Sequence, residues 1–340
     1  MRIRYLLTST AMAVGLALGL LWLLETANAA DPAGIMAERR VCLLGPPTCA
    51  YATIQAAVDA SNAGDVIKVA AGVYAGVNSY GGLSQVVYIS KTVTIRGGYT
   101  TTNWSAFDPV ANRTTLNAGQ AGRVIYITGA VAPTIEGLHI TGGDATGLGG
   151  GVPNWRDAGG GIYVVTATAA ISKNVISGNV ASASAPSPDG MCGGVFLYYS
   201  NALVANNEIS DNTAAWGGAG AWTADGTGGG LHAEGGAPRV VNNRIVQNAG
   251  AVGGLLFANG SGGGLAFVES RPQVITNQIL ENTAGGGFGN GGGVYLAACP
   301  AFTLTNNVIA DNQADYSGSG IEIGSMSGVP SRGRDRKSVV

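Results

Sequence analysis

Apolar and polar residues alternate in short runs along residues 159–324, and the runs recur with a regular repeat. Each repeat opens with a glycine cluster, continues with alternating runs rich in Val, Ile and Tyr, and closes with two Asn residues. The five complete repeats are GGGIYVVTATAAISKNVISGN, CGGVFLYYSNALVANNEISDN, GGGLHAEGGAPRVVNNRIVQN, GGGLAFVESRPQVITNQILEN and GGGVYLAACPAFTLTNNVIADN, and a sixth begins at Gly318. Short runs of period two predict β-strands, and the repetition predicts a solenoid.

The spacing inside a repeat is nearly constant. From the last glycine to the first Asn is 13 residues in four repeats and 14 in the fifth, and the two Asn are 5 residues apart in all five. The connection to the next repeat varies, being 15 residues from Asn179 to Gly194 and 18 from Asn212 to Gly230. A constant part with one elastic segment is typical of coils that stack on one another and bulge at one corner.

Three strands per repeat, stacked in register, predict a parallel β-helix with neighbouring coils about 4.8 Å apart. We expect the two Asn of each coil to lie at corners, where Asn tolerates a left-handed backbone and can bind its own backbone or the Asn of the next coil. Their predicted role is structural, as ladders of identical side chains. These residues are Asn174, Asn179, Asn207, Asn212, Asn243, Asn248, Asn277, Asn282, Asn307 and Asn312.

The N-terminus has the pattern of a targeting segment. Arg2 and Arg4 precede an apolar run, Leu6 to Leu24, and Ala27-Asn28-Ala29 fits a small-x-small cleavage site. We therefore expect a signal peptide over 1–29, with an uncleaved membrane anchor as the alternative. Nothing after residue 30 is apolar for long enough to span a bilayer, so the mature chain is expected to be secreted or held at the cell surface.

A linker over 30–49 is expected next, and Tyr51 to Ala60 predicts a short helix with Ile54, Ala57 and Val58 on one face. The alternating strands DVIKVAAGVY and VVYISKTVTIRGGY follow. The stretches TIQAAVDASNAGDVIKVAAGVY, TVTIRGGY and PTIEGLHITGG, together with the GGGIY…NN-x-I-x-x-N repeats, resemble bacterial secreted proteins with right-handed parallel β-helix repeats, the pectin-lyase-like superfamily. The resemblance covers roughly residues 50–324.

The resemblance implies an all-β, single-stranded right-handed parallel β-helix over 50–324 whose open end is capped by the 51–60 helix. In pectate lyase-like enzymes of this superfamily the polysaccharide lies on one exposed strand face, beside the long loops. After residue 324 the pattern stops, and 325–340 is a basic tail with Arg332, Arg334, Arg336 and Lys337. Because a solenoid needs a terminal cap, we expect the natural C-terminus to lie beyond this point.

The four cysteines divide into two pairs. Cys42 and Cys49 flank the turn-prone Gly45-Pro46-Pro47, so a small disulfide ring is expected there. Cys192 and Cys299 fall three coils apart, roughly 14 Å, which is too far for a disulfide. They are predicted to be buried, small apolar residues.

Composition narrows the function classes. A net charge of −2 gives no electrostatic footprint for nucleic acid, and two histidines in 340 residues argue against a His-based metal centre. With 56 glycines but no collagen period, and 46% apolar residues, the chain is expected to fold rather than stay disordered. We expect a monomer without a nucleic-acid partner.

Alternation also predicts which residues face outward in the first strand of each coil. If Ile162, Val195 and Leu231 point inward, an outer face carries aromatic rings, one His and carboxylates, and the elastic corner adds tryptophans. Such a face suits the apolar C–H side of a sugar ring and its hydroxyl rim. The alternative is that aromatic residues simply fit strand positions well. The candidate ligand-binding residues are Tyr163, Phe196, Tyr198, Trp216, Trp222, Tyr295 and Glu322.

Candidates for catalysis are few. His232 and Glu234 lie on one face of one strand, about 7 Å apart along it, and could serve as a general base and acid. Glu281 and Asp311 would be about 5 Å apart in neighbouring coils, close enough to share a cation such as Ca²⁺. Solvated turn carboxylates are the alternative for that pair, and no other cofactor is expected.

Three hypotheses follow from the sequence. The first is a non-catalytic scaffold that presents a stiff face to a polysaccharide or cell-surface glycan. The second is a polysaccharide lyase or glycoside hydrolase that acts on a uronate-containing polymer through His232 and Glu234. The third is a structural spacer whose function lies in a segment beyond residue 340.

Overall fold

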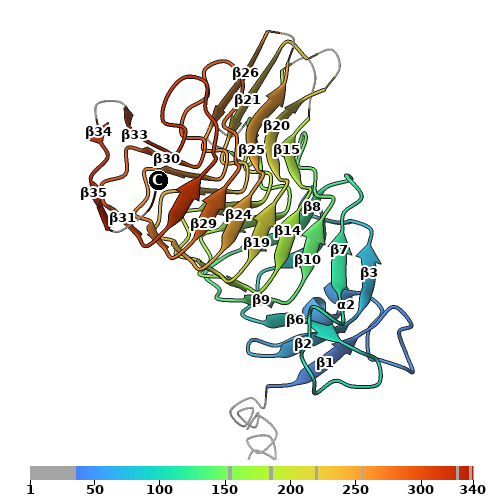
Figure 1. The fold of residues 1–340 in the computed structure, drawn as a ribbon. Helices are drawn as coiled ribbons and strands as arrows, with labels where there is room; N and C mark the ends of the chain where they lie inside the picture. Colours follow the sequence, from blue (N-terminus) through green and yellow to red (C-terminus); the bar gives the residue numbers. More distant parts are fainter. Residues whose placement is uncertain are drawn as a thin grey trace, which may run out of the picture. The chain divides into compact units, whose positions relative to one another are not determined.

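The computed structural model describes residues 36–151, 155–183, 187–218, 221–254, 256–326, 329–336 and 339. The predicted signal peptide over 1–29 lies outside these residues. Three long sheets of short strands run along the molecule, and successive coils contribute one strand to each (Figure 1). All pairings within them are parallel except β4–β5 and β33–β34. The chain is therefore a parallel β-helix with three strands per coil, as the sequence predicts.

The strands of each sheet follow in spatial order. The first sheet contains β1 (Glu38–Val41), β2 (Val66–Ala70), β6 (Thr94–Tyr99), β9 (Thr134–Glu136), β13 (Ala170–Ser172), β18 (Leu203–Ala205), β23 (Arg239–Val241), β28 (Gln273–Ile275), β31 (Phe302–Thr305) and β35 (Gly333–Arg336). The second contains β3 (Gly72–Ala75), β7 (Thr114–Asn117), β10 (His139–Thr141), β14 (Val175–Ser177), β19 (Glu208–Ser210), β24 (Arg244–Val246), β29 (Gln278–Leu280) and β32 (Val308–Ala310). The third contains β4 (Asn78–Tyr80), β5 (Leu83–Ile89), β8 (Arg123–Thr128), β12 (Ile162–Val165), β17 (Val195–Tyr198), β22 (Leu231–Glu234), β27 (Leu265–Val268), β30 (Val294–Ala297), β33 (Ile321–Met326) and β34 (Val329–Pro330).

The core is a set of aligned aliphatic columns inside the coil. In the second sheet, the same register position is isoleucine in six consecutive strands, and each of these side chains is at most 1% exposed. The column consists of Ile140, Ile176, Ile209, Ile245, Ile279 and Ile309. Because side chains alternate between the two faces of a strand, a period-two pattern repeated at constant spacing builds such a column directly.

Two ladders of asparagine amides run along the corners of the coils. In each ladder the Nδ2 of one Asn donates to the Oδ1 of the next at 2.9–3.1 Å, and the ladders join Asn174, Asn207, Asn243, Asn277 and Asn307, and Asn179, Asn212, Asn248, Asn282 and Asn312. The same Oδ1 atoms accept from backbone N–H groups of the preceding Asn. All ten are at most 9% exposed, so each buried amide is satisfied by the neighbouring coils.

The expected left-handed backbone of these asparagines is wrong. Among the described residues, the left-handed residue is the one that precedes each ladder Asn, with φ between 52° and 66°. These residues are Lys173, Asn206, Asn242, Thr276 and Asn306 before the first ladder, and Gly178, Asp211, Gln247, Glu281 and Asp311 before the second. The left-handed residue turns the chain at the corner between two strands, and the Asn that follows it is buried in the coil.

The last glycine of each cluster is required by close packing. A Cβ on Gly230 would lie 2.7 Å from the carbonyl oxygen of Gly264 and 3.0 Å from Nδ2 of Asn248. Gly194 has the same two kinds of neighbour at 2.2 and 3.2 Å. Any side chain at this position would push the second asparagine ladder away from the next coil, which explains why the cluster recurs with the ladder.

The N-terminal end of the stack begins earlier than the sequence indicates. The helix α2 (Ile54–Asp59), capped by Thr53, buries Ile54, Ala57 and Val58 as predicted and packs against β1, β2 and β5. However, β1 lies within the expected linker over 30–49 and pairs in parallel with β2. The sequence pattern does not indicate β1 because the strand contains several charged residues. One of them, Arg39, is accommodated by an internal ion pair, with its Nε 2.8 Å from Oδ2 of Asp65.

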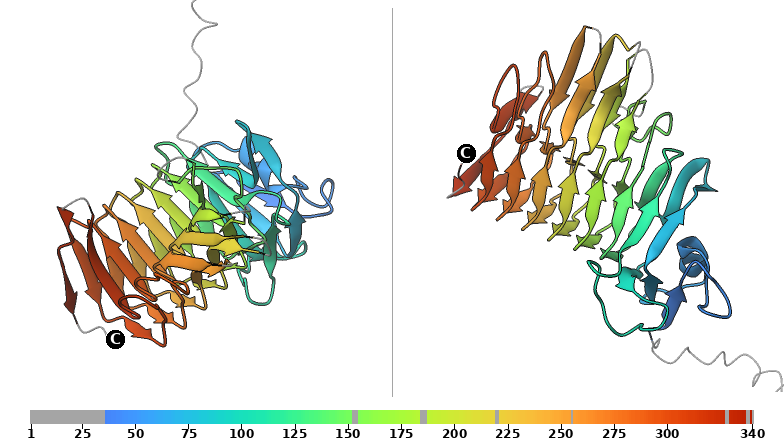
Figure 2. Two further views of the ribbon diagram at one scale, coloured as in Figure 1. Left: turned by 90° about the horizontal axis from the view of Figure 1, so that it is seen from above. Right: turned by 45° about the vertical axis from the view of Figure 1, so that its right-hand side comes forward.

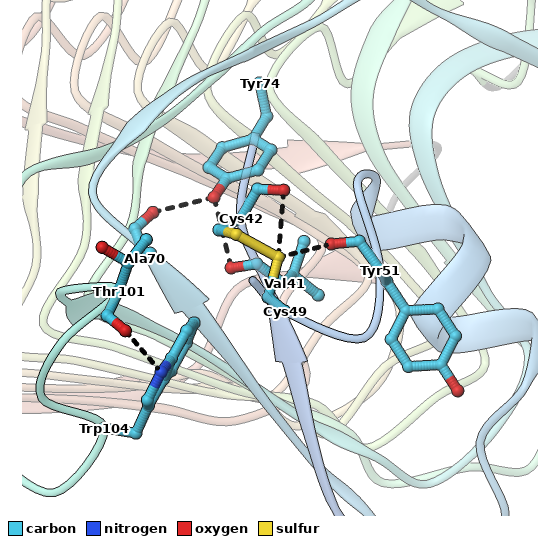
Figure 3. The surroundings of a disulfide bond; sticks show 8 residues. All are labelled: Val41, Cys42, Cys49, Tyr51, Ala70, Tyr74, Thr101 and Trp104. Atoms are coloured by element: carbon cyan, nitrogen blue, oxygen red, sulfur yellow. Dashed lines mark hydrogen bonds between the residues drawn. A yellow bond between two sulfur atoms is a disulfide. The ribbon is translucent and has the colours of Figure 1, made fainter. Parts of the chain in front are cut away.

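Cys42 and Cys49 form a disulfide beside this first strand, with Cα atoms 5.9 Å apart (Figure 3). Trp104 packs on it together with Ala70 and Tyr99, and the indole N–H of Trp104 donates to the carbonyl of Thr101. The other two cysteines, Cys192 and Cys299, are free and buried.

The far end of the chain also holds strands. β34 and β35 lie within the segment predicted as a basic tail, and β35 pairs in parallel with β31. Within the described residues, no helix has the length and apolar content needed to cross a membrane.

The elastic corner of the coil forms additional strands, which the sequence did not predict. Two small parallel sheets stand out from the coils (Figures 1 and 2), and we refer to them together as the arm. One contains β15 (Val180–Ser182), β20 (Thr213–Gly217) and β25 (Ala249–Gly253), and the other β11 (Asp157–Ala158), β16 (Asp189–Met191), β21 (Thr223–Thr227) and β26 (Phe257–Ser261). The variable connection lengths therefore reflect how far each coil extends into the arm.

We predict that replacing Asn243 by Ala lowers the free energy of unfolding by about 2–4 kcal/mol, because Asn207 loses the Asn243 Oδ1 acceptor and the Val204 carbonyl loses a donor inside the coil. The matched control is Asn242→Gly, one residue earlier, which keeps the left-handed backbone and removes an exposed amide. It should cost less than about 1 kcal/mol. Urea denaturation of both variants measures the difference, and equal losses would contradict a structural role for the ladder.

Candidate functional site

A column of stacked rings lies on the outer face of the third sheet. Equivalent positions of consecutive strands carry Tyr88, Tyr126, Tyr163, Phe196 and His232, and successive ring centroids are 5.1–5.6 Å apart. Tyr80 extends the column at the Tyr88 end, at 5.0 Å. Offset and tilted ring pairs at these separations are favourable, so the coil repeat places one ring on the next.

The predicted exposure of this face is wrong in the middle of the column. Tyr163 is 6% exposed, and Phe196 and His232 are fully buried. The arm covers them, because Ala158 and Met191 from its strands form one apolar cluster with Tyr163 and Phe196. Tyr163 and Phe196 are therefore not available to a ligand, and burial raises the pKa of the Tyr163 hydroxyl to about 12.

A buried arginine ties the arm to the ring column. The guanidinium of Arg123 lies 4.7 Å from the ring centre of Tyr163 and donates to the carbonyls of Ala158 and Gly149. Burial lowers its pKa, since the charged form is removed from water. Stacking on an aromatic face and bonding to backbone carbonyls partly replace that water, so Arg123 fixes the loops that lead into the arm.

The ring column stops at Ala266, which occupies the position between His232 and Tyr295. Beside this interruption, a pocket of about 350 Å³ opens between the third sheet and the arm. Its lining consists of Arg156, Met191, Tyr198, Tyr199, Thr227, His232, Glu234, Ser261, Val268, Glu269, Tyr295 and Ala297. The pocket thus combines aromatic walls with ionisable groups, as small-molecule sites do.

His232 and Glu234 meet at this pocket. The His232 Nε2 and a Glu234 carboxylate oxygen are 3.2 Å apart, with His232 fully buried and Glu234 8% exposed. The His232 Nδ1 has no hydrogen-bond partner among the described residues. The pair can share a proton, but the imidazole is enclosed by the protein.

Three tyrosines form the more open walls. Tyr198 and Tyr199 meet edge to face with ring centroids 4.8 Å apart, and Tyr199 is 55% exposed. Tyr295 is half-buried, and burial together with Glu322 raises the pKa of its hydroxyl. These three rings therefore form the aromatic part of the pocket wall.

Arg156 already has a carboxylate partner, since its Nε forms an ion pair with Asp189 on the arm. Burial raises the pKa of Asp189, and the neighbouring Asp225 and Asp157 act in the same direction against the effect of Arg156. Arg156, the arginine among the described lining residues, is thus engaged in an internal ion pair.

The structure brings together only some of the residues singled out from the sequence. Tyr198, Tyr295, His232 and Glu234 line the pocket, whereas Glu322 is half-buried and accepts from Ser317. Trp216 and Trp222 are exposed, at 49% and 57%, but they are not among the pocket residues. The reason is the arm, which carries both tryptophans beyond the coil.

Sequence reasoning missed Tyr199, Glu269 and Arg156. Tyr199 and Glu269 each lie five residues after the last glycine of a cluster and have a left-handed φ, of 46° and 51°. The constant distance from the glycine cluster indicates a corner position at which the residue type varies from coil to coil. Comparing that position between repeats could have identified both residues. Arg156 lies in a connection of irregular length and gave no such signal.

The carboxylates considered for a cation have a turn role. Glu281 and Asp311 are exposed, left-handed corner residues, and Glu281 accepts a hydrogen bond from Gln247 Nε2 at 2.9 Å. In the part of the chain that the structure describes, no group of three or more His, Cys, Asp or Glu is arranged to hold a metal ion.

We predict that Phe196→Ala lowers the free energy of unfolding by about 3–5 kcal/mol, because it leaves a cavity beneath the arm and interrupts the ring column. Phe288→Ala is the control, since Phe288 is 55% exposed, and it should cost below about 1 kcal/mol. Thermal unfolding followed by circular dichroism compares the two. Similar losses would show that the rings on the third sheet are not buried.

A search with protein-family models finds no match, and a search of curated protein sequences also finds none. Two solved structures are similar in fold. Escherichia coli YbhC has a TM-score of 0.42 and 13% identity over 90% of this chain and 85% of that chain. The pectate lyase Pel9A has a TM-score of 0.41 and 13% identity over 89% of this chain and 80% of that chain. The similarity concerns the fold, which in this chain is a parallel β-helix.

Proposed function

We propose that the protein is a non-catalytic β-helix scaffold that binds carbohydrate in the pocket between the third sheet and the arm. The observation that carries this proposal is the grouping of Tyr198, Tyr199 and Tyr295 around about 350 Å³ of space beside Glu234. Tyrosine faces complement the apolar side of a sugar ring, and carboxylate oxygens accept hydrogen bonds from its hydroxyls. The pocket volume is within the range of small-molecule sites, about 300–1,000 Å³.

Export is part of the proposal. The targeting pattern over residues 1–29 and the Cys42–Cys49 disulfide support it, since disulfides persist in oxidising compartments. The partner is then a polysaccharide or a cell-surface glycan, and the protein acts as a monomer, secreted or held at the surface.

A second candidate is a polysaccharide lyase or glycoside hydrolase, and the contact between His232 and Glu234 favours it. Glu269, which lines the same pocket, would be the second carboxylate that a hydrolase needs. We prefer the non-catalytic function because the His232 ring is fully buried and its Nε2 faces Glu234. A general base must come within hydrogen-bond reach of the substrate proton.

Removing a pocket ring should weaken binding without unfolding the protein. We predict that Tyr198→Ala and Tyr295→Ala each lower the affinity for the best ligand of a glycan array about 5–10-fold, the loss expected for one aromatic contact. The control is Tyr316→Ala, because Tyr316 is 68% exposed and does not line the pocket. Calorimetric titration compares the affinity of each variant with that of wild type. Unchanged affinity in both Tyr198→Ala and Tyr295→Ala would contradict the proposed site.

The enzymatic alternative has its own test. Wild-type protein and Glu234→Gln are incubated with a panel of uronate-containing and neutral polysaccharides, and released reducing ends and unsaturated products are measured. The proposed function predicts no product above the level of a protein-free blank. Product release by wild type that Glu234→Gln abolishes would replace the scaffold with an enzyme.

A further inference from the structure

The pocket has an excess of negative charge. Glu234 and Glu269 line it, and Arg156, the arginine in its wall, is paired with Asp189. His232 can balance at most one of the two glutamates, and it contacts Glu234. Among the ion pairs of the described residues, none includes Glu269. Within the part of the chain that the structure describes, one carboxylate at this site therefore has no cationic partner.

The aromatic walls of the pocket also favour a cationic ligand group. The faces of Tyr198, Tyr199 and Tyr295 carry negative partial charge, and an organic cation placed over such a face is attracted by it, more strongly when the cation is desolvated. Rings and carboxylates together recognise an ammonium group, whereas an anionic ligand would face both, and Arg156, the arginine among the described lining residues, is already paired with Asp189. The buried His232 ring, which also lines the pocket, keeps an Nδ1 atom that has no hydrogen-bond partner among the described residues.

We infer that the ligand is a sugar that carries a protonated amine, such as a unit of a glucosamine polymer, and not a uronate. This inference rests on the proposed function and names the class of carbohydrate that the pocket takes. The sugar ring lies against the tyrosines, and its ammonium group lies between Glu234 and Glu269. A uronate carboxylate at the same place would be repelled by both glutamates.

The experiment is calorimetric titration of the full chain with three oligosaccharides of equal length: a β-linked glucosamine tetramer, its N-acetylated form and a galacturonate tetramer. It is carried out at about pH 6, below the pKa of an ordinary amine. We expect the amine form to bind at least about tenfold more tightly than the N-acetylated form, and the galacturonate tetramer to bind more weakly than either.

Charge-removing variants connect the preference to the pocket. Glu269→Gln should reduce the amine preference, measured as the ratio of the two affinities, about 3–10-fold, and Glu234→Gln should do the same. The matched control is Glu281→Gln, because Glu281 is also an exposed glutamate in a left-handed corner, with φ 56° against 51° for Glu269. It should leave the preference unchanged.

The outcomes separate this inference from the proposed function. Equal binding of the amine and N-acetylated tetramers, with a loss in Tyr198→Ala, overturns the amine preference and keeps the carbohydrate site. Tighter binding of galacturonate overturns it as well. If no oligosaccharide binds in a manner that Tyr198→Ala or Tyr295→Ala weakens, both the inference and the proposed function fail.

Discussion

The hydrogen bonds of buried asparagine amides hold this fold in register. Each of the five coils between Asn174 and Asn312 brings two amides into its interior, and a buried amide without partners would cost about 1–3 kcal/mol. The partners come from the coils on either side, as for Asn243, which donates to Asn277 Oδ1 and to the Val204 carbonyl and accepts from Asn207. A coil shifted by one residue would lose these bonds and also turn its aliphatic column outward, so polar and apolar contacts specify the same alignment.

That alignment explains the candidate site. Because the strands of successive coils pair in register, an aromatic residue at one strand position stacks on the ring of the next coil, from Tyr88 to His232. The arm covers the middle of the column and excludes water from it. Where Ala266 replaces a ring, the column stops and the pocket lies beside the break. The pocket thus lies where the regular column of rings is interrupted. Thr227 and Ser261, from two of the five-residue strands of the arm, border it.

The sequence predicts the coil well because the determinants of the coil are local and periodic. Constant distances between glycine clusters and asparagines gave the strands, the inward residues and the ladders. The left-handed position before each ladder Asn was missed because it has no common residue type. Lys173, Thr276 and Asp311 all occupy it. The arm was missed because its strands fall in Gly- and Ala-rich segments of unequal length. Since burial of Tyr163 and Phe196 depends on the arm, their exposure could not be predicted correctly from alternation alone.

Amide hydrogen exchange tests the central claim, that the buried asparagines lock the coils between Asn174 and Asn312 to one another. The backbone N–H groups of Asn207, Asn243 and Asn277 donate to side chains in the following coil and are at most 3% exposed. The account predicts that these amides exchange only when the whole β-helix unfolds, with one common free energy of opening. Exchange at these three sites as rapid as at Gly218, beyond the end of an arm strand, would contradict it.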